Sequence, residues 1–315
     1  MAHGPTILGL LALTAASALT LAATTTDAPT SSAATQATRP GLTLETYPPR
    51  GDAILGRRVY EKRCIGCHGP EGEGNGPATQ WLNPLPRNFQ QANFKFRSTP
   101  SGELPTPEDI VHVVTCGLAG SSMPAFPLMP EGDRKAVAAW VLHLAEFGML
   151  KAEVDLRLDD GDPLDQILGD DWAEILEETI GDAYEDVWPV DVPQPPENDD
   201  DSVARGAQLY QAQCVACHGA GGRGDGPSSY ALRDWKDTEV VPRDFTTGVF
   251  RAGSTGRDLF LRMKTGLNGT PMPQISGSDD DLWALVHFIQ SLQDPDTKEA
   301  PHPTSCAAHS KEAAR

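Results

Sequence analysis

Two copies of the string Cys-x-x-Cys-His lie 150 residues apart, and these residue types can hold an iron cofactor covalently. The copies are Cys64-Ile65-Gly66-Cys67-His68 and Cys214-Val215-Ala216-Cys217-His218. Thiols three positions apart can bond the two vinyl groups of one porphyrin, and the adjacent imidazole can bind its iron. A zinc site or a redox-active dithiol is the alternative. However, a closed zinc site takes about four ligands, and no second Cys-x-x-Cys accompanies either copy. The duplication therefore predicts two c-type haems, held by Cys64, Cys67 and His68, and by Cys214, Cys217 and His218.

An iron bound by one histidine needs a ligand on its far side, and that ligand decides between electron transfer and catalysis at an open position. Met123 follows His68 by 55 residues, and Met272 follows His218 by 54. Both methionines precede proline and follow a Gly-Leu pair by a short loop. The alternative is that they fill space in the core. Their matched loop positions predict axial ligation. The unmatched methionines are expected to pack, and they are Met129, Met149 and Met263.

Three further histidines fall in segments that are expected to be helical. They are His112, His143 and His287, and none has a histidine at the matching position of the other half. Because a shared design would repeat its ligands, we expect these histidines to lie in the core or at the surface and not to bind iron.

Longer matching units surround the two motifs. Gly56 and Tyr60 recur as Gly206 and Tyr210, at a spacing of four that follows one helix face. The stretch Pro86-Arg87-Asn88-Phe89 recurs as Pro242-Arg243-Asp244-Phe245, and strand-like alternation is scarce. The pattern predicts a mostly α fold with two tandem domains. The expected divisions are a signal peptide at 1–23, a flexible segment at 24–50, domains at 51–150 and 201–294, an acidic linker at 151–200 and a flexible tail at 295–315.

Helix boundaries can be read from local signals. Thr106-Pro107-Glu108-Asp109 combines an N-cap, an N1 proline and first-turn acids, and Gly117 is expected to close that helix. Ser278 begins the last helix of the second unit in the same way. Gly148 is the predicted C-cap for the last helix of the first unit.

The beginning of the chain indicates export. An apolar run from Ile7 to Leu13 leads to Ala16-Ser17-Ala18, which has the form of a signal-peptidase site. The run is shorter than the roughly 20 residues that span a bilayer. We therefore expect a periplasmic or otherwise exported protein that is soluble after cleavage, in agreement with the extracytoplasmic completion of c-type haem attachment.

Acidity is concentrated in one segment. The formal net charge is −19, and residues 151–201 hold nineteen Asp or Glu against Lys151 and Arg157. This balance argues against nucleic-acid binding and against adhesion to anionic lipid. Apolar residues at three- and four-residue steps from Leu164 to Ile180 predict short amphipathic helices. The segment is either a spacer or a docking surface for a basic redox partner.

The order CxxCHG, Gly-Pro, Pro-Arg-x-Phe, Gly-Leu-x-Gly-x-x-Met-Pro and an aromatic last helix resembles class I cytochrome c domains. The chain is thus similar to a tandem diheme cytochrome c. The resemblance implies His/Met-ligated iron, an exposed haem edge, and packing of Gly56 and Tyr60 on Trp140 and of Gly206 and Tyr210 on Phe288. It also implies that Arg87 and Arg243 neutralise haem propionates, with Arg97 and Arg251 behind them. Ordinary surface arginines are the alternative.

These features predict an electron-transfer protein, not an enzyme. It would pass electrons between redox proteins, either as a soluble carrier or as a subunit of a larger complex such as a membrane-bound respiratory complex. The alternative is a diheme cytochrome c peroxidase-like enzyme, which would need one iron open to peroxide.

Two cysteines remain outside the motifs. Cys116 and Cys306 could form a disulfide that folds the tail over the first domain, could stay as free thiols, or could form an intermolecular link.

Overall fold

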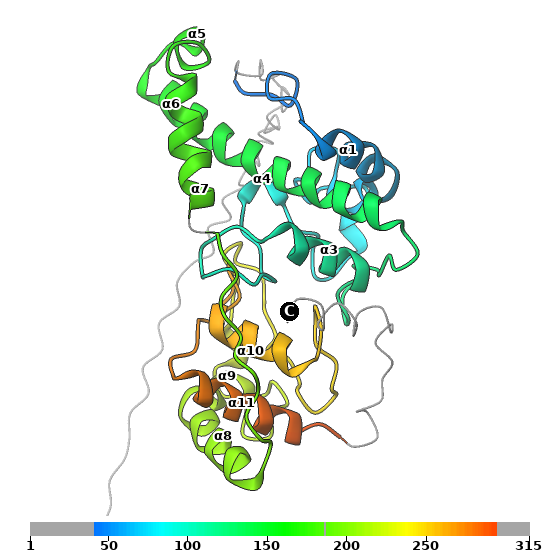
Figure 1. The fold of residues 1–315 in the computed structure, drawn as a ribbon, viewed down its shortest axis with the longest axis vertical. Helices are drawn as coiled ribbons and strands as arrows, with labels where there is room; N and C mark the ends of the chain where they lie inside the picture. Colours follow the sequence, from blue (N-terminus) through cyan, green and yellow to red (C-terminus); the bar gives the residue numbers. More distant parts are fainter. Residues whose placement is uncertain (1–40, 186, 295–315) are drawn as a thin grey trace, which may run out of the picture. The chain divides into compact units, whose positions relative to one another are not determined.

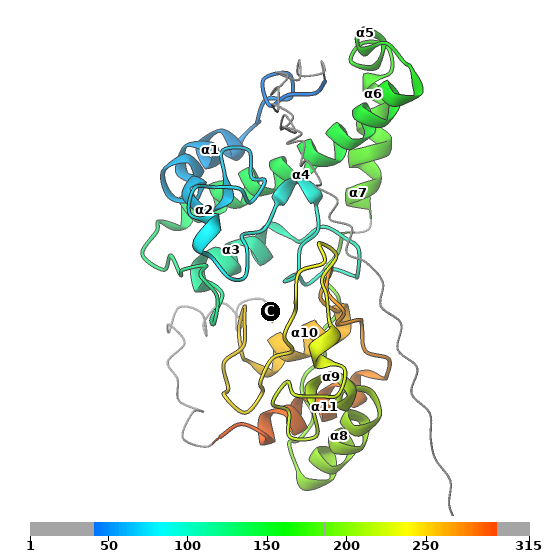
Figure 2. The same cartoon turned by 180° about the vertical axis from the view of Figure 1, so that it is seen from behind.

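The computed structural model describes residues 41–185 and 187–294, and no β-strand occurs among them beyond one isolated bridge, Arg233 to Glu239. Helices joined by long loops make up the rest of the described chain (Figures 1 and 2). The prediction of a mostly α fold is confirmed. None of the described helices combines the length and apolar character that a membrane span requires.

The first domain is built on two crossed helices, α1 (Asp52–Arg63) and α4 (Glu131–Asp160). Gly56 permits the crossing, because a Cβ atom there would lie 1.9 Å from the carbonyl oxygen of Ala136. One turn further on, the ring of Tyr60 packs edge-on against Trp140, with centroids 6.3 Å apart. Between these helices in sequence lie α2 (Ile65–His68), α3 (Pro107–Cys116) and the short 3₁₀ turns η1 (Thr79–Trp81) and η2 (Phe89–Gln91).

The second domain repeats this crossing with α8 (Asp200–Gln213) and α11 (Asp279–Ser291). A Cβ atom at Gly206 would lie 2.0 Å from the carbonyl oxygen of Ala284, and the rings of Tyr210 and Phe288 are 5.0 Å apart. The elements between them are α9 (Val215–His218), η4 (Ser229–Ala231) and α10 (Gly256–Thr265). The helix packing expected from the glycine and aromatic repeat is therefore present in both halves.

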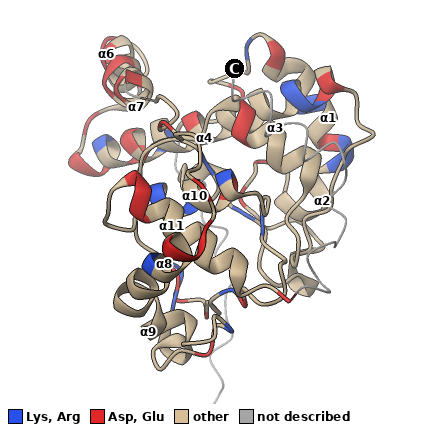
Figure 3. Ribbon diagram, turned by 60° about the horizontal axis from the view of Figure 1, so that its bottom comes forward, with Lys and Arg blue, Asp and Glu red and all other residues tan. Residues whose placement is uncertain are grey.

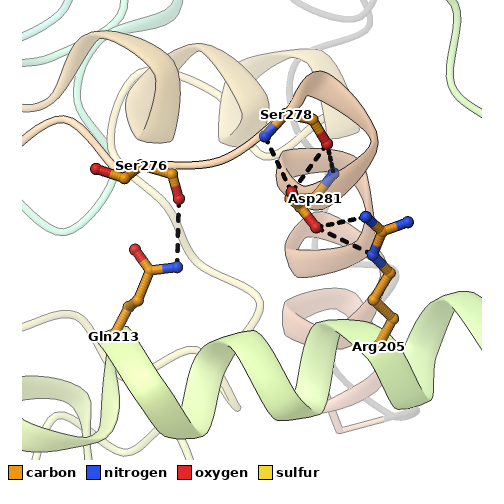
Figure 4. Close-up of polar contacts among 5 residues, drawn as sticks. All are labelled: Arg205, Gln213, Ser276, Ser278 and Asp281. Carbon is orange, nitrogen blue, oxygen red and sulfur yellow. Dashed lines mark hydrogen bonds and ion pairs between the residues drawn. The ribbon is translucent and has the colours of Figure 1, made fainter.

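Capping boxes start the helices as predicted. Thr106 caps α3 and Ser278 caps α11, each accepting a hydrogen bond from the backbone of the acid three residues later. In α11 that acid, Asp281, also pairs with Arg205 of α8 at 2.7 Å (Figure 4). Gln213 donates to the carbonyl of Ser276 at 3.3 Å, so polar contacts join α8 to α11 and to the loop before it.

The predicted C-cap at Gly148 is wrong. Helix α4 runs through this position to Asp160 and ends at Gly161, whose φ of 103° is left-handed. Gly148 is needed for close packing instead, because a Cβ atom there would lie 1.8 Å from the carbonyl oxygen of Gln90 in η2. The helix therefore passes the expected domain boundary at residue 150.

The acidic segment folds into a small helical extension on the end of α4. It contains α5 (Leu164–Ile167), α6 (Trp172–Leu176), a π turn (Glu177–Gly181) and α7 (Asp182–Glu185). Ile167 and Ile175 are fully buried against Phe147, Leu150 and Val154 of α4. The Asp and Glu positions of α6 and α7 are coloured red on the ribbon in Figure 3. The predicted amphipathic helices are thus present, and residues 187–199 continue the chain without helix or strand.

Residues at the end of the segment expected to be flexible, 24–50, are packed against the first domain. Leu42 is 3% exposed and packs in the same cluster as Phe147, and the Tyr47 ring stacks on His143 with centroids 4.8 Å apart. The predicted signal peptide, the tail at 295–315 and Cys306 lie outside the described residues. Cys116 itself is disulfide-bonded.

Candidate functional site

The first cleft brings together the four residues predicted to hold one haem. Cys64, Cys67, His68 and Met123 all line it, and most other lining side chains are apolar. The one-turn helix α2 carries Cys67 and His68, with Cys64 at its N-cap. Met123 comes from the loop after α3, so the cleft is assembled from segments that are far apart in the domain's sequence.

The second cleft repeats the arrangement. Cys214, Cys217, His218 and Met272 line it, again among mainly apolar side chains. The two clefts are of nearly equal size, with about 1370 and 1330 Å³ between their lining atoms, part of it open to solvent. Two large apolar clefts with matched donor sets can each accommodate a flat apolar cofactor.

Backbone carbonyls orient the two histidines. Nδ1 of His68 lies 3.1 Å from the carbonyl oxygen of Arg87, and Nδ1 of His218 lies 3.4 Å from that of Arg243. A proton on Nδ1 leaves Nε2 free to bind a metal. Each ring stacks on a phenylalanine, Phe89 or Phe245, with centroids 4.5 and 4.4 Å apart. Burial lowers the pKa of both histidines, which favours the neutral, ligating form.

The cysteine environment disfavours free-thiol redox chemistry. Burial and the neighbouring Cys67 raise the pKa of Cys64 to about 11, and burial with Cys217 does the same for Cys214. A redox-active dithiol needs a thiolate, which a lowered pKa provides. The alternative of a thioredoxin-like pair therefore has no electrostatic support in either cleft.

The two methionine loops share the same hydrogen bonds and the same pattern of left-handed glycines. The amide of Leu118 donates to the carbonyl of Met123 at 3.1 Å, and the amide of Leu267 donates to that of Met272 at the same distance. A hydroxyl two residues before each methionine accepts from the methionine amide, at 3.2 Å from Ser121 and 3.3 Å from Thr270. Glycines with left-handed φ enter the loops and recur within them: Gly117, Gly120, Gly266 and Gly269.

The remaining histidines and methionines lie outside the two clefts as expected, except for Met263. His112, His143 and His287 lie on α3, α4 and α11 and line neither cleft. Met129 and Met149 pack against the core of the first domain. Met263 is 4% exposed in the core of the second domain, and it also lines the second cleft.

Cations gather at the clefts more densely than the sequence indicated. Arg87 lines the first cleft and Arg243 the second, as predicted. Arg97, however, lines neither, because its guanidinium donates to three carbonyl oxygens elsewhere. Sequence reasoning missed Lys95, which lines both clefts, and Arg262, which lines the second. The only available signal was that Lys95 directly precedes Phe96-Arg97, a Phe-Arg pair that recurs as Phe250-Arg251.

These side chains fit a haem. The cysteine pair, the oriented imidazole and the thioether are donors of the kind that hold c-type haem iron. Buried nitrogens of Arg251 and Arg262 lack a hydrogen-bond partner within the described structure, and a guanidinium matches a carboxylate in geometry. A haem held here would supply one-electron redox chemistry at its iron, and its propionates would offer acceptors to these guanidinium nitrogens.

Comparison with known protein families gives a match for each of the two domains. Residues 51–141 match the family "Cytochrome C oxidase, cbb3-type, subunit III", and residues 203–293 match the family "Cytochrome c". Together the two matches cover more than half of the chain. The chain therefore belongs to the cytochrome c family, as two cytochrome c domains in tandem, each of which implies one covalently bound haem c.

A solved structure supports the same assignment. A chain of the Kuenenia stuttgartiensis reducing HAO-like protein complex Kustc0457/Kustc0458 is 34% identical, with a TM-score of 0.62. The similarity covers 76% of this chain and 96% of that chain. A comparison with curated proteins finds no match. The protein is thus a diheme cytochrome c of electron transfer, similar to a chain of a redox complex.

Proposed function

We propose that the protein is an exported diheme cytochrome c that relays electrons through two His/Met-ligated haems to or from a larger redox complex. The observation that carries this proposal is the matched pair of clefts. Each presents two cysteines, one oriented histidine and one methionine on a loop of the same design. Duplication of the whole donor set is expected of two sites with one shared task.

The proposed roles are based on the positions in the clefts. Cys64 and Cys67 attach the first haem, with His68 and Met123 as axial ligands. The second haem is held by Cys214, Cys217, His218 and Met272. Arg87 and Arg243 face the propionates. Methionine as the second axial ligand favours ferrous iron and raises the potential. A six-coordinate iron also leaves no open position for a substrate.

The closed ligand sets favour electron transfer over a peroxidase. A peroxidase requires one iron that can bind peroxide, and the two sites would then be expected to differ. Instead, both methionine loops share their hydrogen bonds and their left-handed glycines. The alternative enzyme would need one of the loops to leave its iron.

The partner is proposed to be another redox protein. Support comes from the solved relative, which is a chain of a reducing HAO-like complex. The acidic extension of α5 to α7 offers a surface on which a basic partner could dock, since complementary charge raises association rates. Export is proposed from the signal-like N-terminus and from the extracytoplasmic completion of c-type haem attachment.

The ligand assignment is tested by Met123→Ala and Met272→Ala in the holoprotein, with Met149→Ala as a control that is outside both clefts. Each ligand variant should remove the sulfur-to-iron charge-transfer band of one haem and lower one potential in a spectroscopic redox titration. The control should leave both unchanged. Unaltered spectra and potentials in the ligand variants would refute His/Met ligation.

The partner is tested by purification from membranes and soluble extract of the native source. A free carrier is recovered alone, whereas a subunit copurifies with a larger haem protein. The rate of electron exchange with that partner should fall as ionic strength rises. A rate that does not respond to salt would remove the acidic docking surface from the proposal.

A further inference from the structure

The repeated Phe-Arg pair places an arginine at the same point of each domain, and both arginines reach the other domain. Nη2 of Arg97 donates to the carbonyl oxygen of Thr265 at 2.9 Å, where α10 leads into the Met272 loop. Nη2 of Arg251 makes a longer bond, 3.4 Å, to the carbonyl oxygen of Gly120 inside the Met123 loop. Each methionine loop is therefore contacted by the opposite domain.

The two arginines differ in what else they touch. Arg97 is 5% exposed and also donates to the carbonyls of Phe94 and Pro100, so its hydrogen-bonding capacity is largely used. Arg251 lines both haem clefts, and its buried Nε has no hydrogen-bond partner within the described residues. A buried donor without an acceptor is costly, so Arg251 has donor capacity available for a ligand in the clefts.

The charges around Arg251 also call for an anion. Burial and the nearby Arg243 both lower the pKa of Arg251. Burial, with the charges of Arg87 and Arg251, lowers the pKa of Lys95 to about 8, although Asp234 opposes the shift. Like charges crowded at a low-dielectric site are unfavourable unless an anion joins them. Among the described carboxylates, only Asp234 of the second domain raises the pKa of Arg87 and Lys95.

The Met123 loop is close to a second arginine of the second domain. A Cβ atom built at Gly120 would lie 3.1 Å from Nη1 of Arg243. Gly120 therefore lies against two guanidinium groups, one from Arg243 and one from Arg251. The matching glycine, Gly269, faces the side chains of Asn93 and Trp235 instead. Contact with arginine side chains is therefore found at the first methionine loop and not at the matching glycine of the second.

We propose that the second domain completes the first haem site through Arg251. Its guanidinium binds a propionate of the first haem, and its bond to Gly120 keeps the Met123 loop against the iron. This inference rests on the proposed His/Met ligation. A positive charge at this position favours the ferrous form of the first haem, so the potential of that haem depends on a residue of the other domain.

The test is a spectroscopic redox titration of the full holoprotein carrying Arg251→Gln. The first haem is identified beforehand as the component that Met123→Ala alters. Its ferrous-to-ferric ratio at fixed potential should fall about tenfold, which equals about 59 mV for one electron. Its charge-transfer band should also weaken. Arg251→Lys keeps the charge and should restore most of the potential, but not the full band.

Two arginines serve as controls. Arg205→Gln removes the same charge from the second domain at a site that lines neither cleft. Arg97→Gln removes the matching cross-domain arginine and its bond to Thr265. Neither should move the first haem's potential as far as Arg251→Gln does. A shift in Arg251→Gln no larger than in Arg205→Gln would overturn the proposal.

The outcomes separate this inference from the ligand assignment. If Met123→Ala leaves every band unchanged, the ligation itself is wrong, whatever Arg251 does. If Met123→Ala removes a band and Arg251→Gln leaves that haem unaltered, only the cross-domain role fails. If Arg251→Gln shifts the second haem alone, the side chain serves its own domain, and the proposal is again refuted.

Discussion

The two domains share one helix crossing but differ in the length of their last helix. In both, a glycine lets the first helix touch the backbone of the last: Gly56 of α1 lies against α4, and Gly206 of α8 lies against α11. The last helix of the first domain continues to 30 residues and carries the acidic extension, whereas that of the second is 13 residues long. The shared part positions the proposed haem ligands, and the unshared part supplies the charge. A duplicated fold can thus keep its redox site while only one copy gains a new surface.

The largest expected effect tests the shared crossing. Gly56→Ala and Gly206→Ala each place a methyl group about 2 Å from a helix carbonyl oxygen, and we expect each to cost about 3 kcal/mol or more. Denaturant unfolding of the holoprotein, followed by haem absorbance, measures the loss. Gly132→Ala has open space around the new Cβ atom and should be neutral or slightly stabilising. Tolerance of either crossing substitution would show that the two domains do not depend on the same contact.

A second effect concerns pH and sharpens the difference between the domains. Burial, with the charges of Arg50 and Arg57, lowers the pKa of His143 to about 4, although a bond to Tyr47 opposes this. The unfolded chain then binds a proton at higher pH than the folded chain, so stability is present above about pH 6.5 and falls as pH drops toward 4. The loss is at most about 3 kcal/mol.

His143→Gln should remove most of that acid-dependent loss, measured as unfolding free energy between pH 7 and pH 4.5. His287 in α11 is the comparison in the second domain. Burial lowers its pKa as well, but the charge of Asp199 opposes the shift, so His287→Gln should remove less. Equal pH profiles for wild type and His143→Gln would place the acid sensitivity elsewhere.

A third effect tests whether the acidic extension belongs to the first domain. Ile175 is fully buried against α4, so Ile175→Ala should cost about 2 kcal/mol, the lower end for a buried isoleucine. Leu156→Ala on α4, at a side chain that is 56% exposed, should change little. If hydrogen exchange shows the loss in α4 as well as in α6, the two fold together. Faster exchange in α6 alone would make the extension an independent appendage.

The sequence predicted the site better than its surroundings. Repeated motifs were sufficient to place Cys64, His68 and Met123 together, because covalent attachment and axial ligation fix both residue type and spacing. Gly148 was misread, because a glycine needed for contact with Gln90 looks the same in sequence as one that ends a helix. Lys95 was missed, and Arg251 was expected only behind Arg243. That both side chains line both clefts depends on how the two halves of the chain meet.

The smallest effect compares the matched capping boxes of α3 and α10. Thr106→Ala and Thr255→Ala should each cost about 1 kcal/mol, the usual value for a lost N-cap. Thr255 should be the costlier loss by a few tenths. Its hydroxyl donates to Asp258 at 2.7 Å in addition to accepting from the Asp258 amide. In α3, by contrast, the hydroxyl of Ser98 donates to Asp109 at 3.0 Å and remains after the substitution.

Denaturant unfolding of the two alanine variants, with Thr106→Ser and Thr255→Ser as controls, measures this difference. Both serine variants keep the hydroxyl and should lie within about 0.5 kcal/mol of the wild type. A larger loss at Thr106 would mean that the bond from Ser98 depends on the cap instead of substituting for it. The first domain would then hold α3 through one cooperative network, whereas the second holds α10 through a purely local box.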